Sequence, residues 1–415
     1  MSIALFNDNR LFYKQYPVSG VPPAGGPPVL RAAALTGLGA AVGALSWGPH
    51  WWQLGLAVLL PALWSASGSR RGAWVVATAY YLGATRGLPA GAGMFFAGQP
   101  AALAWGYGWW LADALLLGGA WGLLWHHRQR ALRVALVVAV LALPPVGALG
   151  WGSPLLAAGV WFPGLGLVGA VATWVLIGTT AGIAAGARAA RPIGALLVLA
   201  ALVTNLTYQR PADPPGWVGV NTRLGPVANR FFAQYRRQVA LQAMARRRID
   251  AGARVVVFPE SIVGSWTPAV AYWWRPVDAR ARRSGVSLLL GTQYPRRAGW
   301  DAGFAERGAR NAALLSRQPI PISEYAPWDP AHTAHAHWWN PGIGRAAGRT
   351  FGYLVCYEEV LVWPALVTAA HHPQVLVAVA NDWWTAGTGL AQRQSAAAQA
   401  WARLLGVPLV VAVNR

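Results

Sequence analysis

Cys356 is the only cysteine of the 415-residue chain and the first candidate for a reacting group. It follows the apolar run 352–355, which predicts a buried strand, and precedes the segment 358–363, whose pattern predicts the start of a helix. Backbone N–H groups at a helix N-terminus stabilise negative charge, so a thiol at such a turn would ionise easily and could act as a nucleophile. A lone cysteine is also a common core residue, so Cys356 alone does not decide between the two interpretations.

Polar residues end two further predicted strands. The β-branched run 254–258 leads to Glu260, and the apolar run 375–380 leads to Asn381, Asp382 and Trp383. Reacting groups of α/β folds lie at strand ends, so we expect these side chains to converge on Cys356. A carboxylate there could take the thiol proton and return it to a leaving group, while the sulfur forms an acyl-thioester.

Four segments support this interpretation by their order along the chain: FPES (258–261), GYLVCYEE (352–359), ANDWW (380–384) and ARLLGVPLVVAVN (402–414). In this order they resemble the nitrilase, or carbon–nitrogen hydrolase, superfamily. The resemblance is strongest to its membrane-bound branch, which contains apolipoprotein N-acyltransferase and the TraB-type conjugal transfer proteins. It covers about residues 217–415 and implies an α/β domain built as a four-layer αββα sandwich, with no metal or other cofactor.

The resemblance also implies roles for individual residues. Cys356 would be the nucleophile and Glu260 the general base, while Glu324, in the segment PISEYAP, matches a second glutamate of the family. The substrate pocket would be lined by Tyr357, Glu358 or Glu359, Asn381, Asp382 and Trp383.

One family feature is missing from the chain. The family uses a lysine whose ammonium stabilises the developing oxyanion, but the only lysine here is Lys14, near the other end of the chain. Counted back from Glu324, the lysine position falls on Ser316, with Arg317 next to it. We expect Arg317 to supply the positive charge, although a guanidinium is larger and forked. Another arginine, or a loss of catalysis, remains an alternative.

The composition places the first half of the chain in a membrane. The chain is 55% hydrophobic and only 11% charged, and residues 1–207 hold 11 Lys or Arg and 2 Asp or Glu, against 23 and 11 in residues 208–415. Most of the apolar stretches approach the roughly 20 residues that a spanning helix needs. They occupy residues 30–48, 51–67, 72–93, 99–125, 131–150, 155–187 and 192–208. We therefore predict an N-terminal arm at 1–28, a domain of about seven transmembrane helices at 29–208, and a hydrolase-like domain at 209–415.

The arginines predict the orientation of these spans. The loops around Arg70, His126–Arg133 and Arg188 are basic, whereas the loops 47–51, 87–100 and 150–154 have no lysine or arginine. Basic loops remain in the cytoplasm. We expect a multi-pass protein of a bacterial inner membrane, with a cytoplasmic N-terminus and a periplasmic hydrolase-like domain.

Two charged residues lie in or near the predicted spans, namely Arg86 and Asp113. Charge inside a membrane is often functional, so the two could face each other or a polar path beneath the site. Alternatively, Arg86 reaches the outer interface and Asp113 is a structural acid.

The remaining signals concern partners. The net charge is +21, and anionic lipid headgroups are a simpler partner for it than nucleic acid, for which no motif is visible. His332, His335 and His337 with Asp329 are spaced loosely for metal ligands, and we favour a surface segment there.

Two functions follow from the sequence. The first is a Cys-dependent hydrolase or N-acyltransferase acting on an amphiphilic acyl or amide substrate at the outer leaflet. The second is a catalytically impaired scaffold within a conjugation apparatus, with other conjugation proteins as partners. Cys356 and Glu260 favour the enzyme, and the absent lysine favours the scaffold.

Overall fold

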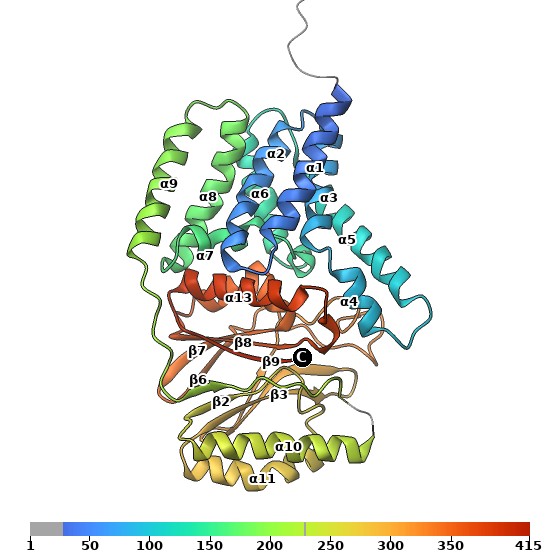
Figure 1. Ribbon diagram of the computed structural model, residues 1–415, viewed down its shortest axis with the longest axis vertical. Helices are drawn as coiled ribbons and strands as arrows, with labels where there is room; N and C mark the ends of the chain where they lie inside the picture. The colour runs from blue at the N-terminus through green and yellow to red at the C-terminus, as the bar shows by residue number, and fades with distance from the viewer. Residues whose placement is uncertain (1–27, 228–229) are drawn as a thin grey trace, which may run out of the picture.

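The computed structural model describes residues 28–227 and 230–415, so the predicted N-terminal arm lies almost wholly outside the described residues. Up to Thr207 the chain is helical (Figure 1). The α-helices of this part are α1 (Pro28–Ser46), α2 (Leu60–Ala66), α3 (Arg70–Ala84), α4 (Leu88–Phe95), α5 (Ala102–Leu124), α6 (Arg130–Ala142), α7 (Ala158–Trp161), α8 (Gly166–Ala184) and α9 (Ala190–Thr207). Three short 3-10 helices join them: η1 (Trp51–Leu59), η2 (Val146–Leu149) and η3 (Pro154–Ala157).

The prediction of about seven spans is not confirmed. Three of the described helices are long and apolar enough to cross a membrane, with windows at Val29–Ser46, Gly166–Ala184 and Ala190–Thr207. Two other predicted stretches are divided by chain breakers. The stretch 72–93 is interrupted between α3 and α4, where Pro89 begins a new helix, and the stretch 131–150 ends its α-helix before Pro144. Proline lacks the N–H that a continuing helix needs, which explains these interruptions.

The second half of the chain is an α/β domain with two sheets. The first sheet has the order β1 (Trp217–Gly219), β2 (Val255–Val257), β3 (Ser287–Pro295), β4 (Trp300–Gly308) and β5 (Ala312–Leu315). Strands β1, β2 and β3 are parallel, and β4 and β5 are antiparallel additions. The second sheet has the order β6 (Ile343–Ala346), β7 (Arg349–Val355), β8 (Val375–Asn381) and β9 (Leu409–Asn414), with β7, β8 and β9 parallel.

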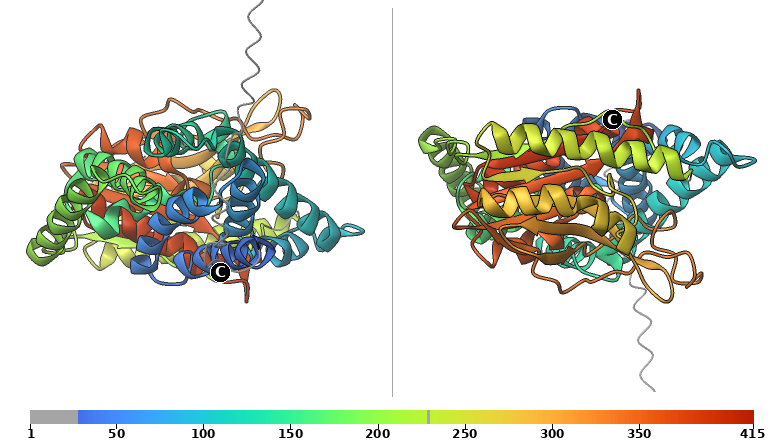
Figure 2. Two further views of the ribbon diagram at one scale, coloured as in Figure 1. Left: turned by 90° about the horizontal axis from the view of Figure 1, so that it is seen from above. Right: turned by 90° about the horizontal axis from the view of Figure 1, so that it is seen from below.

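These elements stack as four layers, as the resemblance implied. Helices α10 (Phe231–Asp250) and α11 (Pro268–Arg283) cover the outer face of the first sheet (Figures 1 and 2). Helices α12 (Val362–Ala369) and α13 (Leu390–Leu405) connect the parallel strands of the second sheet. A short 3-10 helix follows each of two strands: η4 (Cys356–Val360) follows β7, and η5 (Trp383–Thr385) follows β8. The inner faces of the two sheets share one apolar core, which includes Val257, Leu289, Phe351 and Val377.

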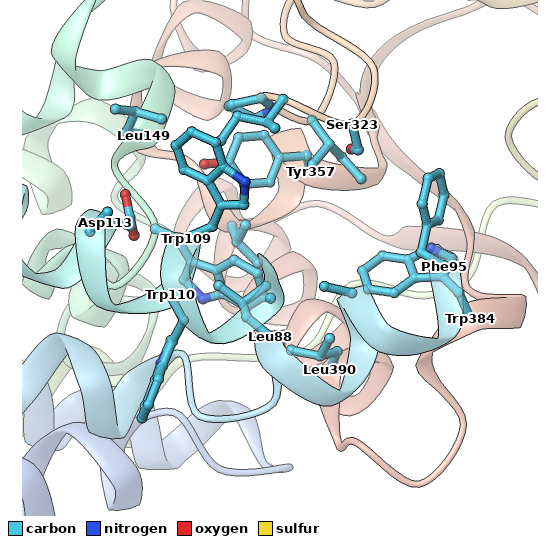
Figure 3. Close-up of a pocket in the computed structure, with 18 of the residues that line it drawn as sticks. Leu88, Phe95, Trp109, Trp110, Asp113, Leu149, Ser323, Tyr357, Trp384 and Leu390 are labelled. Carbon is cyan, nitrogen blue, oxygen red and sulfur yellow. The ribbon is translucent and has the colours of Figure 1, made fainter. Parts of the chain in front are cut away.

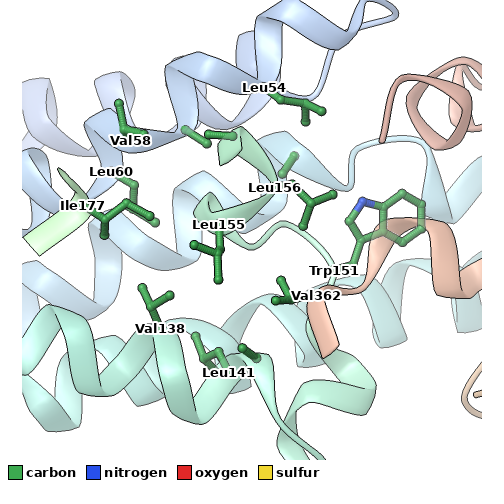
Figure 4. Close-up of a cluster of buried hydrophobic side chains, with 14 of the residues drawn as sticks. Leu54, Val58, Leu60, Val138, Leu141, Trp151, Leu155, Leu156, Ile177 and Val362 are labelled. Carbon is green, nitrogen blue, oxygen red and sulfur yellow. The ribbon is translucent and has the colours of Figure 1, made fainter. Parts of the chain in front are cut away.

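Helix α13 lies between the second sheet and the helical bundle (Figure 1). One apolar cluster joins Leu54, Trp151 and Leu156 of the bundle to Val362 and Trp401 of the α/β domain (Figure 4). The contact is close at α7, because a Cβ on Gly159 would lie 1.8 Å from the carbonyl oxygen of Ala400. The bundle and the hydrolase-like domain therefore form a continuous core through α13.

Candidate active site

Glu260 is held at the end of strand β2 by a close approach of β3. A Cβ on Gly291 would lie 1.8 Å from the carbonyl oxygen of Pro259 and 2.8 Å from the Cα of Glu260, so only glycine fits there. The amide of Val263 donates to the carbonyl of Gly291 over 3.1 Å. The side chain of Glu260 is buried as a result.

Cys356 lies directly after strand β7, with its backbone at φ 49°. This left-handed conformation is uncommon for a residue other than glycine and occurs often at functional sites. The carboxyl group of Glu260 lies close enough to the Cys356 thiol to raise the pKa of that thiol. The sulfur and the carboxylate that we predicted from separate strands thus share one buried site.

The predicted activation of the thiol by a helix N-terminus is wrong. Cys356 opens the five-residue 3-10 helix η4, and the α-helix α12 begins only at Val362. Burial raises the pKa of the Cys356 thiol well above its usual range, and the nearby charges of Glu260, Asp382 and Glu324 raise it further. At neutral pH the thiol is therefore protonated and needs a base before it can attack.

The carboxyl groups around the thiol also prefer their neutral forms. Burial raises the pKa of Glu260 well above its usual range, and the charge of Glu324 adds to the effect. Burial likewise raises the pKa of Glu324, although the amide of Ile320 donates to its carboxylate over 3.1 Å. Burial raises the pKa of Asp382 to about 7, and its Oδ1 has no hydrogen-bond partner among the described residues.

Arg317 does not stand free beside the thiol, contrary to the prediction. Its side chain is fully buried and forms an ion pair with Glu358, with 2.7 Å between Nη2 and Oε2. Its remaining donors bind other groups. Nε donates to Glu358, Nη1 to the carbonyl of Pro364 and the hydroxyl of Thr368, and Nη2 also to the carbonyl of Tyr353. All five N–H donors of a guanidinium are thereby used, and none is left for an oxyanion.

The same network removes Glu358 from the predicted pocket lining. Its carboxylate accepts from the hydroxyl of Ser316 over 2.7 Å as well as from Arg317. Ser316, which stands at the lysine position of the family, therefore also belongs to this buried structural pair. The charges that act most strongly on the thiol come from the carboxyl groups of Glu260, Asp382 and Glu324.

An apolar cavity of about 270 Å³ reaches Cys356 from the helical bundle (Figure 3). Helices α4 and α5 form one wall, and the segment 320–323 with the start of α13 forms another. The residues that line the cavity include Leu88, Trp109, Trp110, Asp113, Tyr357, Trp384 and Leu390. A chamber of this kind fits an apolar chain that ends at a reacting group.

The other predicted site residues are distributed around this cavity. Tyr357 lines it and packs edge-on against Trp151, with 6.4 Å between ring centroids. Trp383 stacks on Phe95 of α4 at 5.9 Å instead of facing the thiol. The side-chain oxygen of Asn381 accepts from Asn414 over 2.7 Å, and its backbone is hydrogen-bonded to the carboxyl of Glu260. Glu359 is buried next to Gln394, and burial raises the pKa of its carboxyl group well above the usual range.

Sequence reasoning missed the contribution of the bundle to this site. Trp109 and Trp110 of α5 both line the cavity. Asp113 lines it as well, and no ion pair with Arg86 is present among the described residues. The only signal in the sequence was the tryptophan-rich stretch 105–110 followed by an isolated acid, which does not by itself indicate a pocket.

The histidine-rich segment binds an aspartate from strand β4. His335 Nδ1 and His337 Nε2 lie 2.8 Å and 3.0 Å from Oδ1 of Asp301, and His332 contacts Asp329. The described residues contain no group of three or more side chains arranged to hold a metal ion.

Comparison with known proteins places this architecture in a family. The conjugal transfer protein TraB of Agrobacterium fabrum is 34% identical over 407 residues, which cover 92% of this chain and 93% of that protein. The chain belongs to the TraB family of conjugal transfer proteins. A second relative, the probable conjugal transfer protein TraB of Sinorhizobium fredii, is 32% identical over 93% of this chain and 98% of its own length.

This member of the TraB family is similar to other proteins over part of its length. An apolipoprotein N-acyltransferase of Methylococcus capsulatus is 28% identical over 158 residues, covering 34% of this chain and 30% of that protein. Among solved structures, an amidase of the nitrilase superfamily from Nesterenkonia is 18% identical, with a TM-score of 0.29, over 41% of this chain and 68% of the amidase. No family model matches the chain.

Proposed function

We propose that this TraB-family protein is a membrane-embedded, Cys-dependent carbon–nitrogen hydrolase or N-acyltransferase that acts on an amphiphilic substrate. One observation supports the proposal above all others. Cys356 lines an apolar cavity built by both domains, and the buried Glu260 carboxyl lies close enough to the Cys356 thiol to raise the pKa of that thiol. Such a cavity would hold an apolar chain and bring its acyl carbon to the sulfur.

The proposed reaction uses only groups of this site. In its ionised form, Glu260 takes the proton of the Cys356 thiol, and the thiolate attacks the acyl carbon of an amide or ester. The bond to the leaving amine or alcohol then breaks, Glu260 returns the proton to that leaving group, and an acyl-thioester remains on the sulfur. Water or an amine releases the acyl group in a second step, giving its proton to Glu260 while the sulfur leaves and is reprotonated.

The orientation in the membrane is part of the proposal. Arg70 donates to the carbonyl of Trp125, and Arg130 donates to the carbonyl of Ser65, so two basic loops gather at one end of the bundle. The turn from α8 to α9, with Arg188 and Arg191, lies at the end of the bundle that faces away from the α/β domain (Figure 1). Because basic loops stay in the cytoplasm, this arrangement supports a periplasmic active site at the outer leaflet of a bacterial inner membrane.

A second function is favoured by one specific observation, the acidic surroundings of the thiol. Arg317 is sequestered by Glu358, and Ser316 stands at the family lysine position, so neither offers a free positive charge to an oxyanion beside Cys356. In this alternative the fold is a catalytically impaired scaffold that binds other components of a conjugation apparatus.

Covalent labelling separates the two functions. The full chain in detergent is incubated with an activated acyl donor, such as a p-nitrophenyl ester of a fatty acid, and then digested for mass spectrometry. The enzyme proposal predicts a hydroxylamine-sensitive adduct on the peptide of Cys356. Cys356→Ala should abolish the adduct, and Glu260→Gln should slow its formation by about 100-fold, the usual range for loss of a general base.

Asp250→Asn is a matched control, because Asp250 pairs with Arg280 at an exposed site far along the chain from both groups. A relative that retains the family lysine serves as a positive control for the donor. If that relative is labelled and this protein is not, the scaffold is the better description.

A further inference from the structure

Two arginines meet where the bundle joins helix α13. Arg86 follows helix α3, and Arg393 lies in the first turn of α13. The side chains are neighbours, since a Cβ on Gly87 would lie 2.9 Å from Nη1 of Arg393 and the charge of Arg86 acts on Arg393. Two guanidinium groups of like charge therefore share one corner of the structure.

Neither arginine has an acidic partner among the described residues. Arg393 is only 5% exposed, and its Nη1 is fully enclosed without a hydrogen-bond acceptor. Arg86 is more exposed, and its Nη1 donates to the carbonyls of Gly83 at 3.0 Å and Trp47 at 3.4 Å. Burial and the charge of Arg86 lower the pKa of Arg393 to about 10, so both groups still carry charge at neutral pH.

A buried charge without a counter-ion is costly, and proteins normally pair it. The other two buried arginines have partners: Arg317 forms an ion pair with Glu358, and Arg237 donates to the backbone carbonyls of Leu224, Gly225 and Pro226. Arg393 differs from both, because its enclosed Nη1 has no acceptor among the described residues, which indicates that its counter-ion comes from outside the chain. Paired guanidiniums suit the oxygen atoms of a phosphate group, to which they donate in forked geometry.

The position of the pair connects it to the cavity. Leu88 and Leu390, which line the apolar cavity, lie two positions after Arg86 and three before Arg393. They stand close to each other at the cavity wall (Figure 3). A molecule with an apolar chain in the cavity could therefore place a polar head near these arginines.

We propose that Arg86 and Arg393 form a phosphate-binding site beside the cavity, whose ligand is the phosphate of an amphiphile with its acyl chain in the cavity. The proposal deepens the proposed function by naming a phospholipid as the substrate class, and the choice of a lipid phosphate rests on that function. Binding itself does not require the thiol, so the site can be tested apart from catalysis.

The test measures the thermal unfolding midpoint of the delipidated full chain in a non-ionic detergent. Three additions are compared: dioleoyl phosphatidylglycerol, inorganic phosphate, and dioleoylglycerol, which has the same chains without phosphate. The variants are Arg393→Gln and Arg86→Gln. Arg71→Gln is the control, because Arg71 is exposed in the first turn of α3, at the opposite end of that helix from Arg86.

We expect phosphatidylglycerol to raise the midpoint of the natural protein and of Arg71→Gln, with at least about tenfold weaker apparent affinity in either of the other variants. Without ligand, Arg393→Gln should unfold at a higher temperature than the natural protein, because it removes an uncompensated buried charge. If Arg393 served only to stabilise the fold, Arg393→Gln would unfold at a lower temperature than the natural protein. Should Arg393→Gln fail to fold, Arg86→Gln at the more exposed position gives the same comparison of affinities.

The three additions distinguish the sources of the phosphate. A response to inorganic phosphate that equals the lipid response supports the site and assigns it to free phosphate. Equal responses to dioleoylglycerol and phosphatidylglycerol, or unchanged affinity in both variants, overturn it. Cys356→Ala should bind the lipid normally, so loss of the thioester with retained binding contradicts only the proposed chemistry.

Discussion

Two buried clusters of charge lie within a few residues of each other and are compensated in opposite ways. Around Glu358, the carboxylate is fully paired by Arg317 and Ser316. Around Cys356, two residues earlier, the strongest charges on the thiol are those of Glu260, Asp382 and Glu324, while the charge of Arg415 acts on Asp382. Arg317 therefore stabilises the fold by pairing with Glu358, while the strongest charges on the thiol come from carboxyl groups.

This difference explains why the missing lysine is not simply replaced. A guanidinium whose donors all have partners cannot also move toward a developing oxyanion without breaking a buried ion pair, which typically costs about 3–5 kcal/mol. The site around the thiol instead keeps its charge low by holding protons. Stabilisation of a developing oxyanion would then depend on groups that the substrate brings into the cavity.

The largest expected effect tests the structural cluster. Arg317→Met leaves the Glu358 carboxylate buried and without its cation, so we expect the protein to lose about 3–5 kcal/mol of stability. Thermal or denaturant unfolding in detergent measures the loss. The double variant Arg317→Met, Glu358→Gln should recover part of it, because no uncompensated charge remains.

Arg345→Met is the control, since Arg345 is exposed on strand β6 and should change stability by less than about 0.5 kcal/mol. If Arg317→Met instead keeps its stability and loses thioester formation, the guanidinium has the chemical role that the sequence suggested. The distinction between a structural cluster around Glu358 and a reactive cluster around Cys356 would then not hold.

A smaller effect tests the acidic cluster through Asp382. Its pKa is raised to about 7, so the folded state holds the proton that the unfolded state has released. Stability from this group is therefore present at low pH and is lost as the pH rises from about 4 through 7. Asp382→Asn should stabilise the protein at pH 8 by about 2–4 kcal/mol and leave it nearly unchanged at pH 4. Unfolding midpoints at the two pH values provide the measurement.

Asp250→Asn provides the reference here too, because an exposed ion pair contributes about 0–1 kcal/mol at either pH. Equal effects of the Asp382 substitution at both pH values would show that this carboxyl group does not hold a proton in the folded state.

The smallest effect concerns the thiol itself. Burial raises the pKa of Cys356, and the charges of Glu260, Asp382 and Glu324 add to this, so alkylation by iodoacetamide should be slow at pH 8. Glu260→Gln removes the base proposed to accept the thiol proton and should slow alkylation further, by up to about tenfold. Alkylation is followed by mass spectrometry over pH 7–10. A faster reaction in this variant would mean that Glu260 acts on the thiol only through its charge and would contradict its role as the general base.

Much of the α/β domain could be predicted from the sequence. The apolar runs before Glu260, Cys356 and Asn381 fix strands whose polar ends must meet at one edge. The residue pattern of a strand and the residue types of a turn are local properties, so they can be recognised without knowledge of the tertiary structure. The change in composition near residue 208 likewise coincides with the end of α9 at Thr207.

Three features were decided only by the tertiary structure. Whether Arg317 faces the thiol or Glu358 depends on how β5 and η4 pack. Arg317 pairs with Glu358 because a buried carboxylate needs a cation. The cavity between α4, α5 and α13 joins segments that lie hundreds of positions apart. The unpaired Arg393 becomes notable only once burial and its neighbours are known.

The amino-acid sequence by itself thus determined which side chains stand at the strand ends and that half of the chain is apolar. These are consequences of residue type and spacing. The packing of distant segments determined the protonation of the thiol, the partner of each arginine and the shape of the cavity, because burial and charge at a point depend on every element that surrounds it.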